Sequence, residues 1–226
     1  TLTFTTPHFK KAKPAKSGTS VSACRDLNIG YRNYYLTKSL TSGGTCITIS
    51  AHNVTLDCQG YTITANKNIL VKNRYQAVKN PIVKNCTTVQ RQQQFASPAI
   101  TFYNTNKGQL INSRILVTQY GAVGVEARMS PSLLIENNTI NVTSSTAAGA
   151  GYGFGIEMYR APSAKILKNT INVSAGKGGY GIYDSGMTSN VTIENNTIIV
   201  SGLISVSGIS LGSKSSGYNI TGNNIT

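Results

Sequence analysis

The chain has only seven acidic residues among 226, and three of them stand at related places in a repeated phrase. Glu126 and Glu157 each follow a Gly-Val or Gly-Ile dipeptide, and Asp184 lies one place further along in the next copy. If the copies stack as strands, the carboxylates lie about one strand spacing apart, which matches the ~5 Å separation of a retaining glycosidase pair. Arg128 and Arg160 follow nearby and would neutralise the carboxylates as an exposed charge network. The same five residues therefore permit glycan cleavage or a purely structural interpretation.

The rest of the composition supports catalysis poorly. Tyrosines near the acidic residues could stack on sugar rings, but the chain has no Trp, the commonest sugar platform. His8 and His52 are the only histidines and lie far from these carboxylates in sequence, which argues against a Ser-His-Asp arrangement. Cysteine spacing of the Cys-x-x-Cys kind is absent. We therefore expect no catalytic residues, no metal site and no cofactor. If the chain is an enzyme, the candidates are Glu126, Glu157, Asp184, Arg128 and Arg160.

Two repeated phrases must position these residues. The first ends in an isoleucine preceded by an Asn-rich bend, and its closing isoleucines are Ile140, Ile171, Ile198 and Ile225, at steps of 31, 27 and 27 residues. The second is a Gly-[Val/Ile] strand whose glycines are Gly124, Gly155, Gly181 and Gly208, at steps of 31, 26 and 27. Two ladders with one period of this length indicate a solenoid, in which each unit buries its apolar side against a neighbour.

The residues within one period indicate strands. Ile140 and Val142 alternate with Asn141 and Thr143, and later copies repeat this pattern, which is typical of half-buried β-strands. Weaker copies around Ile111, Val83 and Leu56 bring the total to about seven coils. Asn suits the bend because it tolerates the left-handed backbone region, and stacked Asn side chains can hydrogen-bond along the rod.

The repeated I-x-x-N-x-I pattern, the G-[VI]-x strands and the stretch from Cys46 to Cys58 resemble right-handed parallel β-helix repeat proteins. More narrowly, they resemble the NosD-like and archaeal surface proteins that carry such repeats. The resemblance covers roughly residues 46–226 and implies an all-β, single-stranded right-handed parallel β-helix, a solenoid of about seven coils. It implies little about function, because the family includes lyases, hydrolases, epimerases, adhesins and non-catalytic surface proteins. The lyases of this kind use Ca²⁺ with an Arg base, but the Asp-rich clusters of a strong Ca²⁺ site are absent from this sequence.

The two ends of the chain differ from the repeats. Residues 1–23 are predicted to be an extended basic arm with one short strand, residues 24–46 a disulfide-linked cap, and residues 47–226 the β-helix. The sequence stops inside a repeat, and an open β-helix end would invite pairing with another chain. Either the polypeptide continues beyond residue 226 or another subunit completes the stack. We expect the second arrangement, head-to-tail self-assembly that uses the first strand and the last coil. The predicted assembly residues are Thr1, Leu2, Thr3, Phe4, Thr5, Thr6, Asn219, Ile220, Asn223 and Ile225.

Four cysteines suggest two crosslinks. Cys58 and Cys86 occupy matching places in adjacent coils, and the distance between stacked positions one coil apart is close to the Cα separation that a disulfide needs. Cys24 and Cys46 would then close the cap. The alternative is four buried free thiols. A chain that begins with Thr1 fits either a mature protein after signal removal or a fragment. Disulfides and an exported form together favour an extracellular or cell-surface location. By strand alternation the outward Asn-x-Ser/Thr sites, and so the predicted glycosylation sites, are Asn141, Asn172 and Asn219.

The formal net charge of +14 favours anionic partners. Basic residues are dense in the arm and again at Lys67, Lys72, Arg74, Lys79 and Lys84. Proteins that bind single-stranded nucleic acid place aromatic residues among their basic ones, but Tyr75 is the only aromatic residue between Lys67 and Lys84. We therefore do not expect nucleic acid as a partner. No apolar run approaches the ~20 residues of a membrane span.

These observations favour a non-catalytic, extracellular structural protein of a microbial cell surface that self-assembles head-to-tail into a filament or coat. Its partners would be further copies of itself, with an anionic polysaccharide or the cell envelope as an additional partner. The alternatives are a polysaccharide lyase or glycoside hydrolase that acts at a β-helix face, and a monomeric carbohydrate-binding adhesin.

Overall fold

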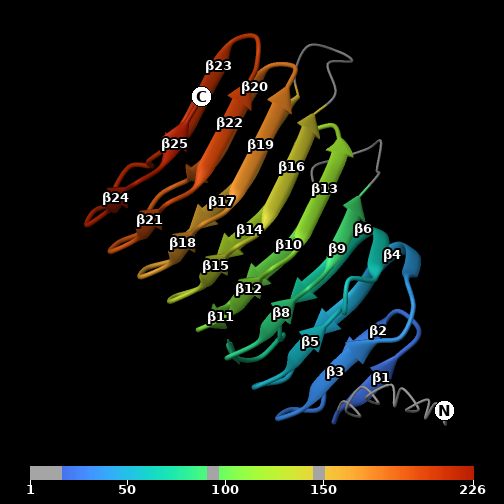
Figure 1. The fold of residues 1–226 in the computed structure, drawn as a ribbon. Coiled ribbons are helices and arrows are strands. Elements are labelled where there is room, and N and C mark those ends of the chain that lie inside the picture. The colour runs from blue at the N-terminus through green and yellow to red at the C-terminus, as the bar shows by residue number, and fades with distance from the viewer. Residues whose placement is uncertain (1–16, 91–96, 145–150) are drawn as a thin grey trace, which may run out of the picture.

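A computed structural model describes residues 17–90, 97–144 and 151–226 of the chain, and every regular element in them is a β-strand (Figure 1). The strands stack in parallel as the rungs of a solenoid, with β1 and β24 at opposite ends of the stack. The predicted all-β, right-handed parallel β-helix is confirmed. The predicted strand of residues 1–6 and most of the basic arm lie outside the described residues.

The first sheet has nine parallel strands. In spatial order these are β1 (Thr19–Val21), β3 (Asn33–Leu36), β5 (Thr55–Asp57), β8 (Ile82–Lys84), β12 (Gln109–Ile111), β15 (Leu134–Glu136), β18 (Lys165–Leu167), β21 (Thr192–Glu194) and β24 (Asn219–Thr221). The seven copies of the Asn phrase fall on the seven strands from β5 to β24, so they enclose six complete turns. Parallel pairing already begins at β1, upstream of residue 47, where the sequence places the start of the β-helix.

The second sheet has fourteen strands and divides at the long strand β6 (Thr62–Val71) into two rows. One row is β9 (Thr87–Gln90), β13 (Arg114–Gln119), β16 (Thr139–Ser144), β19 (Thr170–Ala175), β22 (Thr197–Ser201) and β25 (Asn224–Ile225). The other is β10 (Pro98–Tyr103), β14 (Ala122–Arg128), β17 (Tyr152–Tyr159), β20 (Gly178–Asp184) and β23 (Ser205–Ser210). At the N-terminal side β4 (Leu40–Ile49) pairs with β6 and with β2 (Arg25–Leu27), while β7 (Val78–Lys79) and β11 (Thr105–Asn106) form a separate pair.

The two sequence ladders meet face to face in the core. A Cβ atom built on Gly124 would lie 2.7 Å from Cγ2 of Ile140 and 2.6 Å from the carbonyl oxygen of Gly155. The other three glycines of the ladder face the closing isoleucine of their own coil in the same way. Only glycine allows the two rows to approach this closely. Each coil therefore needs a glycine opposite its closing isoleucine, which is why the two residues recur with nearly the same period.

Two neighbouring positions of the Asn phrase have different roles, one in the bend and one in the hydrogen-bonded ladder. Asn137 and Asn195 each adopt φ 55°, so the first Asn of the phrase makes the left-handed bend. The second Asn is buried and forms the ladder: Asn169 Oδ1 accepts a hydrogen bond from the Asn138 N–H at 2.9 Å, and Asn169 Nδ2 donates to the Ile135 carbonyl at 2.9 Å. The ladder column comprises Ser113, Asn138, Asn169, Asn196 and Asn223.

Both predicted disulfides are confirmed. Cys24 bonds Cys46 with their Cα atoms 4.5 Å apart, and Cys58 bonds Cys86 with a Cα separation of 4.7 Å. Cys86 also continues the ladder column, because its N–H donates to Ser113 Oγ at 3.1 Å. The Cys58–Cys86 disulfide therefore lies where the hydrogen-bonded ladder ends, and it joins two coils whose copies of the Asn phrase are weak.

Candidate functional site

The row β10-β14-β17-β20 carries two of the three predicted acidic residues, Glu126 and Glu157, on its outer face. Glu126 of β14 pairs in register with Glu157 of β17, and Glu157 pairs with Tyr183 of β20. The structure thus brings Glu126 and Glu157 to the same outward position on adjacent coils, as their places in the repeat predict. With strands about 4.8 Å apart, the two carboxylates are neighbours.

A shallow depression of about 250 Å³ lies over the two carboxylates. Its lining residues are Glu126, Ala127, Arg128, Glu157, Tyr159 and Ser185. Partial burial raises the pKa of Glu157 above its ordinary value and the Glu126 carboxylate raises it further, whereas the Arg128 guanidinium opposes the shift. Glu157 is therefore more easily protonated than an ordinary glutamate side chain.

The two predicted arginines lie against one aromatic ring. The guanidinium carbon of Arg128 is 5.3 Å from the ring centroid of Tyr159, and that of Arg160 is 5.2 Å from the same centroid. Arg160 also donates through Nε to the sulfur of Met187 at 3.2 Å. Within the described residues, neither arginine forms an ion pair with Glu126 or Glu157, so both guanidinium groups keep donors for a ligand.

Next to the carboxylates stands an aromatic cluster. Phe154 and Tyr180 stack with ring centroids 5.3 Å apart and planes 8° apart. Tyr183 tilts against both, with centroids at 5.2 Å and 5.1 Å, and Tyr152 stacks beside them at 6.4 Å and 6.3 Å. All four rings are partly exposed. The tyrosines of this cluster were predicted from the sequence to stack on sugar rings, whereas Phe154 was not. Its place could have been found from the repeat, because Phe154 precedes Gly155 as Tyr180 precedes Gly181.

Asp184 does not join this face. Its side chain is fully buried, because a shift of one residue along a strand turns the side chain to the opposite side. The carboxylate accepts hydrogen bonds from the Tyr218 hydroxyl at 2.7 Å, the Gly186 N–H at 2.9 Å and the Thr188 hydroxyl at 2.9 Å. Its geometry fits a structural anchor between coils, so the candidate set reduces to Glu126, Glu157, Arg128 and Arg160.

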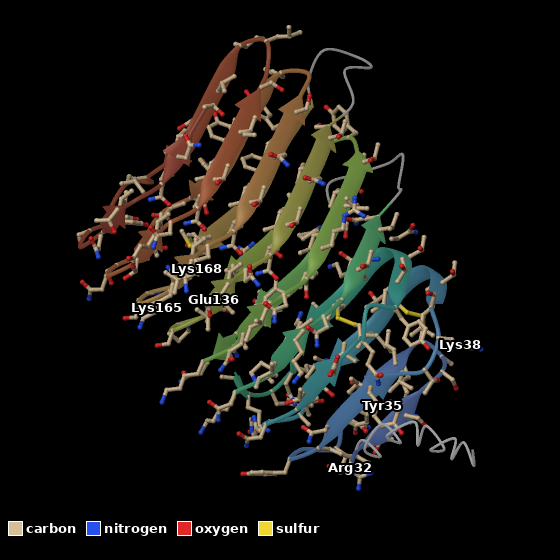
Figure 2. All side chains as sticks on the ribbon, in the orientation of Figure 1. Arg32, Tyr35, Lys38, Glu136, Lys165 and Lys168 are labelled. Atoms are coloured by element: carbon tan, nitrogen blue, oxygen red, sulfur yellow. A yellow bond between two sulfur atoms is a disulfide. The ribbon has the colours of Figure 1, made fainter. Side chains whose placement is uncertain are left out.

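The first sheet carries a separate charged site. Lys168 Nζ lies 3.5 Å from Glu136 Oε1, and Lys165 lies on the same part of the sheet (Figure 2). This exposed ion pair contributes little to stability, as such pairs generally do.

Two of the three predicted glycosylation sites hydrogen-bond to each other. Asn172 Nδ2 donates to Asn141 Oδ1 at 2.8 Å, so the atom of Asn172 that would carry a glycan already takes part in a hydrogen bond. Asn219 is exposed. Among the predicted assembly residues, Ile220 and Ile225 are 40% and 47% exposed in the last coil, and Thr1 to Thr6 lie outside the described residues.

Within residues 17–90, 97–144 and 151–226, no group of three or more His, Cys, Asp or Glu side chains gathers as a metal site would require. The same parts of the chain contain no helix of the length and apolarity that membrane crossing demands.

A family model described as "Right handed beta helix region" matches residues 75–225, two thirds of the chain. The chain belongs to this family of right-handed β-helix proteins. Family membership defines the fold and leaves the reaction, if any, open. The narrower resemblance to archaeal surface proteins stays a prediction, and no curated protein matches the chain.

Solved structures similar to the chain include ORF18 of Geobacillus virus E2, at 8% identity over 85% of this chain and 54% of that one, with a TM-score of 0.33. A GH136 lacto-N-biosidase from Eubacterium ramulus has 8% identity over 85% and 49%, with a TM-score of 0.31. The A-module of the mannuronan C-5 epimerase AlgE6 from Azotobacter vinelandii has 11% identity over 86% and 80%, with a TM-score of 0.19. The chain spans about half the length of the first two proteins.

Proposed function

We propose that the chain is an extracellular, non-catalytic β-helix protein that binds carbohydrate through its aromatic–carboxylate face, defined as Glu126, Glu157, Phe154, Tyr180 and Tyr183. The observation that carries this proposal is the aromatic cluster directly beside two carboxylates in register on one outward face. Sugar rings present apolar C–H surfaces that bury well against aromatic faces, and carboxylates accept hydrogen bonds from sugar hydroxyls. Two disulfides support an oxidising, extracellular location.

The double substitution Phe154→Ala/Tyr180→Ala should weaken glycan binding at least about tenfold, which corresponds to ~1.4 kcal/mol. The reason is that both rings lose their stacked surface while the strands that carry them keep their backbone pairing. Calorimetric titration with oligosaccharides selected on a glycan array measures the effect. Tyr31→Ala is the matched control, because Tyr31 is 85% exposed and lies in the turn before β3. Equal affinities for both variants would contradict the proposal.

A second candidate function, glycan cleavage, is favoured by the register of Glu126 and Glu157 and by the raised pKa of Glu157. Carboxylates on adjacent strands have the separation of a retaining pair, and a carboxyl group whose pKa is raised is better suited to act as a general acid. If the face is catalytic, Glu157→Gln should lower kcat at least about a hundredfold, the lower bound for general acid catalysis. The measurement is release of reducing ends from the bound oligosaccharides. Turnover that persists in Glu157→Gln, or no turnover by the unaltered protein, removes this candidate.

Self-assembly is a further proposal, and it concerns Asn219, Ile220, Asn223 and Ile225 of the last coil. The two isoleucines would be buried by any further coil, whether the same polypeptide or a second copy supplies it. If a second copy does, sedimentation should reveal oligomers whose population rises with concentration, and Ile225→Asp should abolish them by placing a charge in the contact. A single species at every concentration would contradict assembly.

A further inference from the structure

The outer face of this row continues toward the N-terminus beyond the carboxylates. Arg128 pairs in register with Tyr103 of β10. Phe102 of β10 pairs with Val71, the last residue of β6, and the next residue, Lys72, places its Nζ 4.7 Å from the Tyr103 ring centroid. Cations and aromatic rings therefore alternate along four successive coils: Lys72, Tyr103, Arg128 and Tyr159. This ladder leads from the carboxylate depression to a second depression.

The second depression, which we term the basic groove, has a volume of about 530 Å³ and lies over β2, β4 and the end of β6. Its lining residues are Asp26, Thr48, Ser50, Leu70, Lys72, Asn73, Arg74 and Tyr75. Lys72, Arg74 and Tyr75 are exposed, and Tyr75 reaches 87%. This basic stretch is also evident in the sequence, but neither glycan binding at Glu126 and Glu157 nor the fold accounts for it.

Local hydrogen bonds hold the groove in shape. Asn73 Nδ2 donates to the Ser50 carbonyl at 2.7 Å, and Asn73 Oδ1 accepts from the Tyr75 N–H at 2.9 Å. These contacts fix the turn that presents Arg74, whose guanidinium carbon lies 5.7 Å from the Tyr75 ring centroid. Preorganised donors lose less entropy when a ligand binds.

The groove has a surplus of positive charge. Its acidic member, Asp26, already accepts a hydrogen bond from Ser50 Oγ at 2.8 Å. Within the described residues neither Lys72 nor Arg74 has an ion-pair partner, so both remain available to an anionic group. A planar guanidinium beside an ammonium group suits a carboxylate, sulfate or phosphate oxygen set.

We infer that the basic groove is a subsite for the acidic group of a glycan whose neutral sugars occupy the aromatic–carboxylate face. The inference rests on the proposed function and names its ligand class: an oligosaccharide that lies along the coil axis and carries an anionic group at one end. Strand β6, which Lys72 directly follows, and strand β17, which carries Glu157, are three strand spacings apart, roughly 14 Å, which a short oligosaccharide spans. Tyr103 lies between the two depressions and supplies a stacking surface for the connecting sugar.

The test uses hexasaccharides of glucose, mannose and galactose, each paired with the same hexasaccharide in which one terminal unit is the uronic acid. Calorimetric titration should show that the acidic member of a pair binds roughly tenfold more tightly than its neutral counterpart. Lys72→Gln/Arg74→Gln should remove this preference and leave affinity for the neutral member unchanged. Arg114→Gln/Lys165→Gln is the matched control, because it removes the same net charge from strands outside this row.

Three outcomes are distinguishable. Loss of the acidic preference in the groove variant alone supports the subsite. Equal binding of neutral and acidic members, or an equal effect of both variants, overturns the subsite while glycan binding at the aromatic–carboxylate face stands. If no oligosaccharide in either series binds the unaltered protein, the proposed function fails and the subsite fails with it.

Discussion

Gly155→Ala should lower the free energy of unfolding by about 3 kcal/mol or more. A Cβ atom at this position would come 2.5 Å from the Gly181 carbonyl oxygen and would also strike Cγ2 of Ile171. The first of these neighbours is backbone in the adjacent coil, so it can move only if the coil spacing changes. Chemical denaturation monitored by circular dichroism measures the loss.

Gly43→Ala is the control for this prediction. Apart from Gly43 itself and its two chain neighbours, no residue has an atom within 4 Å of a Cβ built on Gly43, so this variant should stay within about 0.5 kcal/mol of the unaltered protein. Equal stabilities of the two variants would mean that the close approach of the glycine and isoleucine ladders does not determine the coil cross-section.

Asp184→Ala should also destabilise the protein by about 3 kcal/mol or more. The substitution leaves the Tyr218 hydroxyl, the Thr188 hydroxyl and the Gly186 N–H without their acceptor in a buried place. Asp26→Ala is the control, since Asp26 is exposed and accepts a single hydrogen bond from Ser50. A loss no larger than that of the control would show that the Asp184 network contributes nothing specific.

Asp184 should also make the free energy of unfolding depend on pH. Burial alone would raise the pKa of Asp184, but hydrogen bonds from Ser215, Tyr218, Gly186 and Thr188 outweigh it and hold the pKa below its ordinary value. A carboxyl group whose pKa is lowered on folding contributes stability above its unfolded pKa of about 3.9, and this stability is lost as pH falls through the folded value.

The difference in unfolding free energy between the unaltered protein and Asp184→Asn should therefore shrink as pH falls below about 4. Taking the difference cancels Glu157, whose raised pKa acts in the opposite sense. A difference that stays constant down to pH values of about 2 would contradict a charged Asp184 in the folded protein.

The repeat made much of the fold predictable. Cys58 and Cys86 could be paired because each ends the same phrase in adjacent copies, and Glu126 and Glu157 could be aligned for the same reason. That the glycine ladder faces the isoleucine ladder was not predicted, because a period locates residues along the chain but does not say which strands meet across the core. The close approach of Gly155 to Ile171 follows from the folded structure and not from their spacing in the sequence.

The candidate site was predicted only in part. Asp184 was grouped with the two glutamates although alternation along the strand turns it inward, so stricter use of the two-residue period would have removed it. The connection from Arg128 through Tyr103 to Lys72 was missed for a different reason. The early coils have weak copies of the phrase, and their register follows from strand pairing rather than from any visible repeat.

The most direct test of the account is to observe which aromatic rings a glycan touches. Protein labelled with ¹³C in its tyrosine and phenylalanine rings would be titrated with an oligosaccharide selected on the array, and the ring resonances followed by NMR. If the proposed face binds the glycan, the resonances of Phe154, Tyr180 and Tyr183 shift with one common affinity, whereas those of Tyr31 and Tyr61, on other parts of the surface, do not shift. Shifts confined to the latter pair, or no shift with any glycan, would contradict a carbohydrate-binding face on this β-helix.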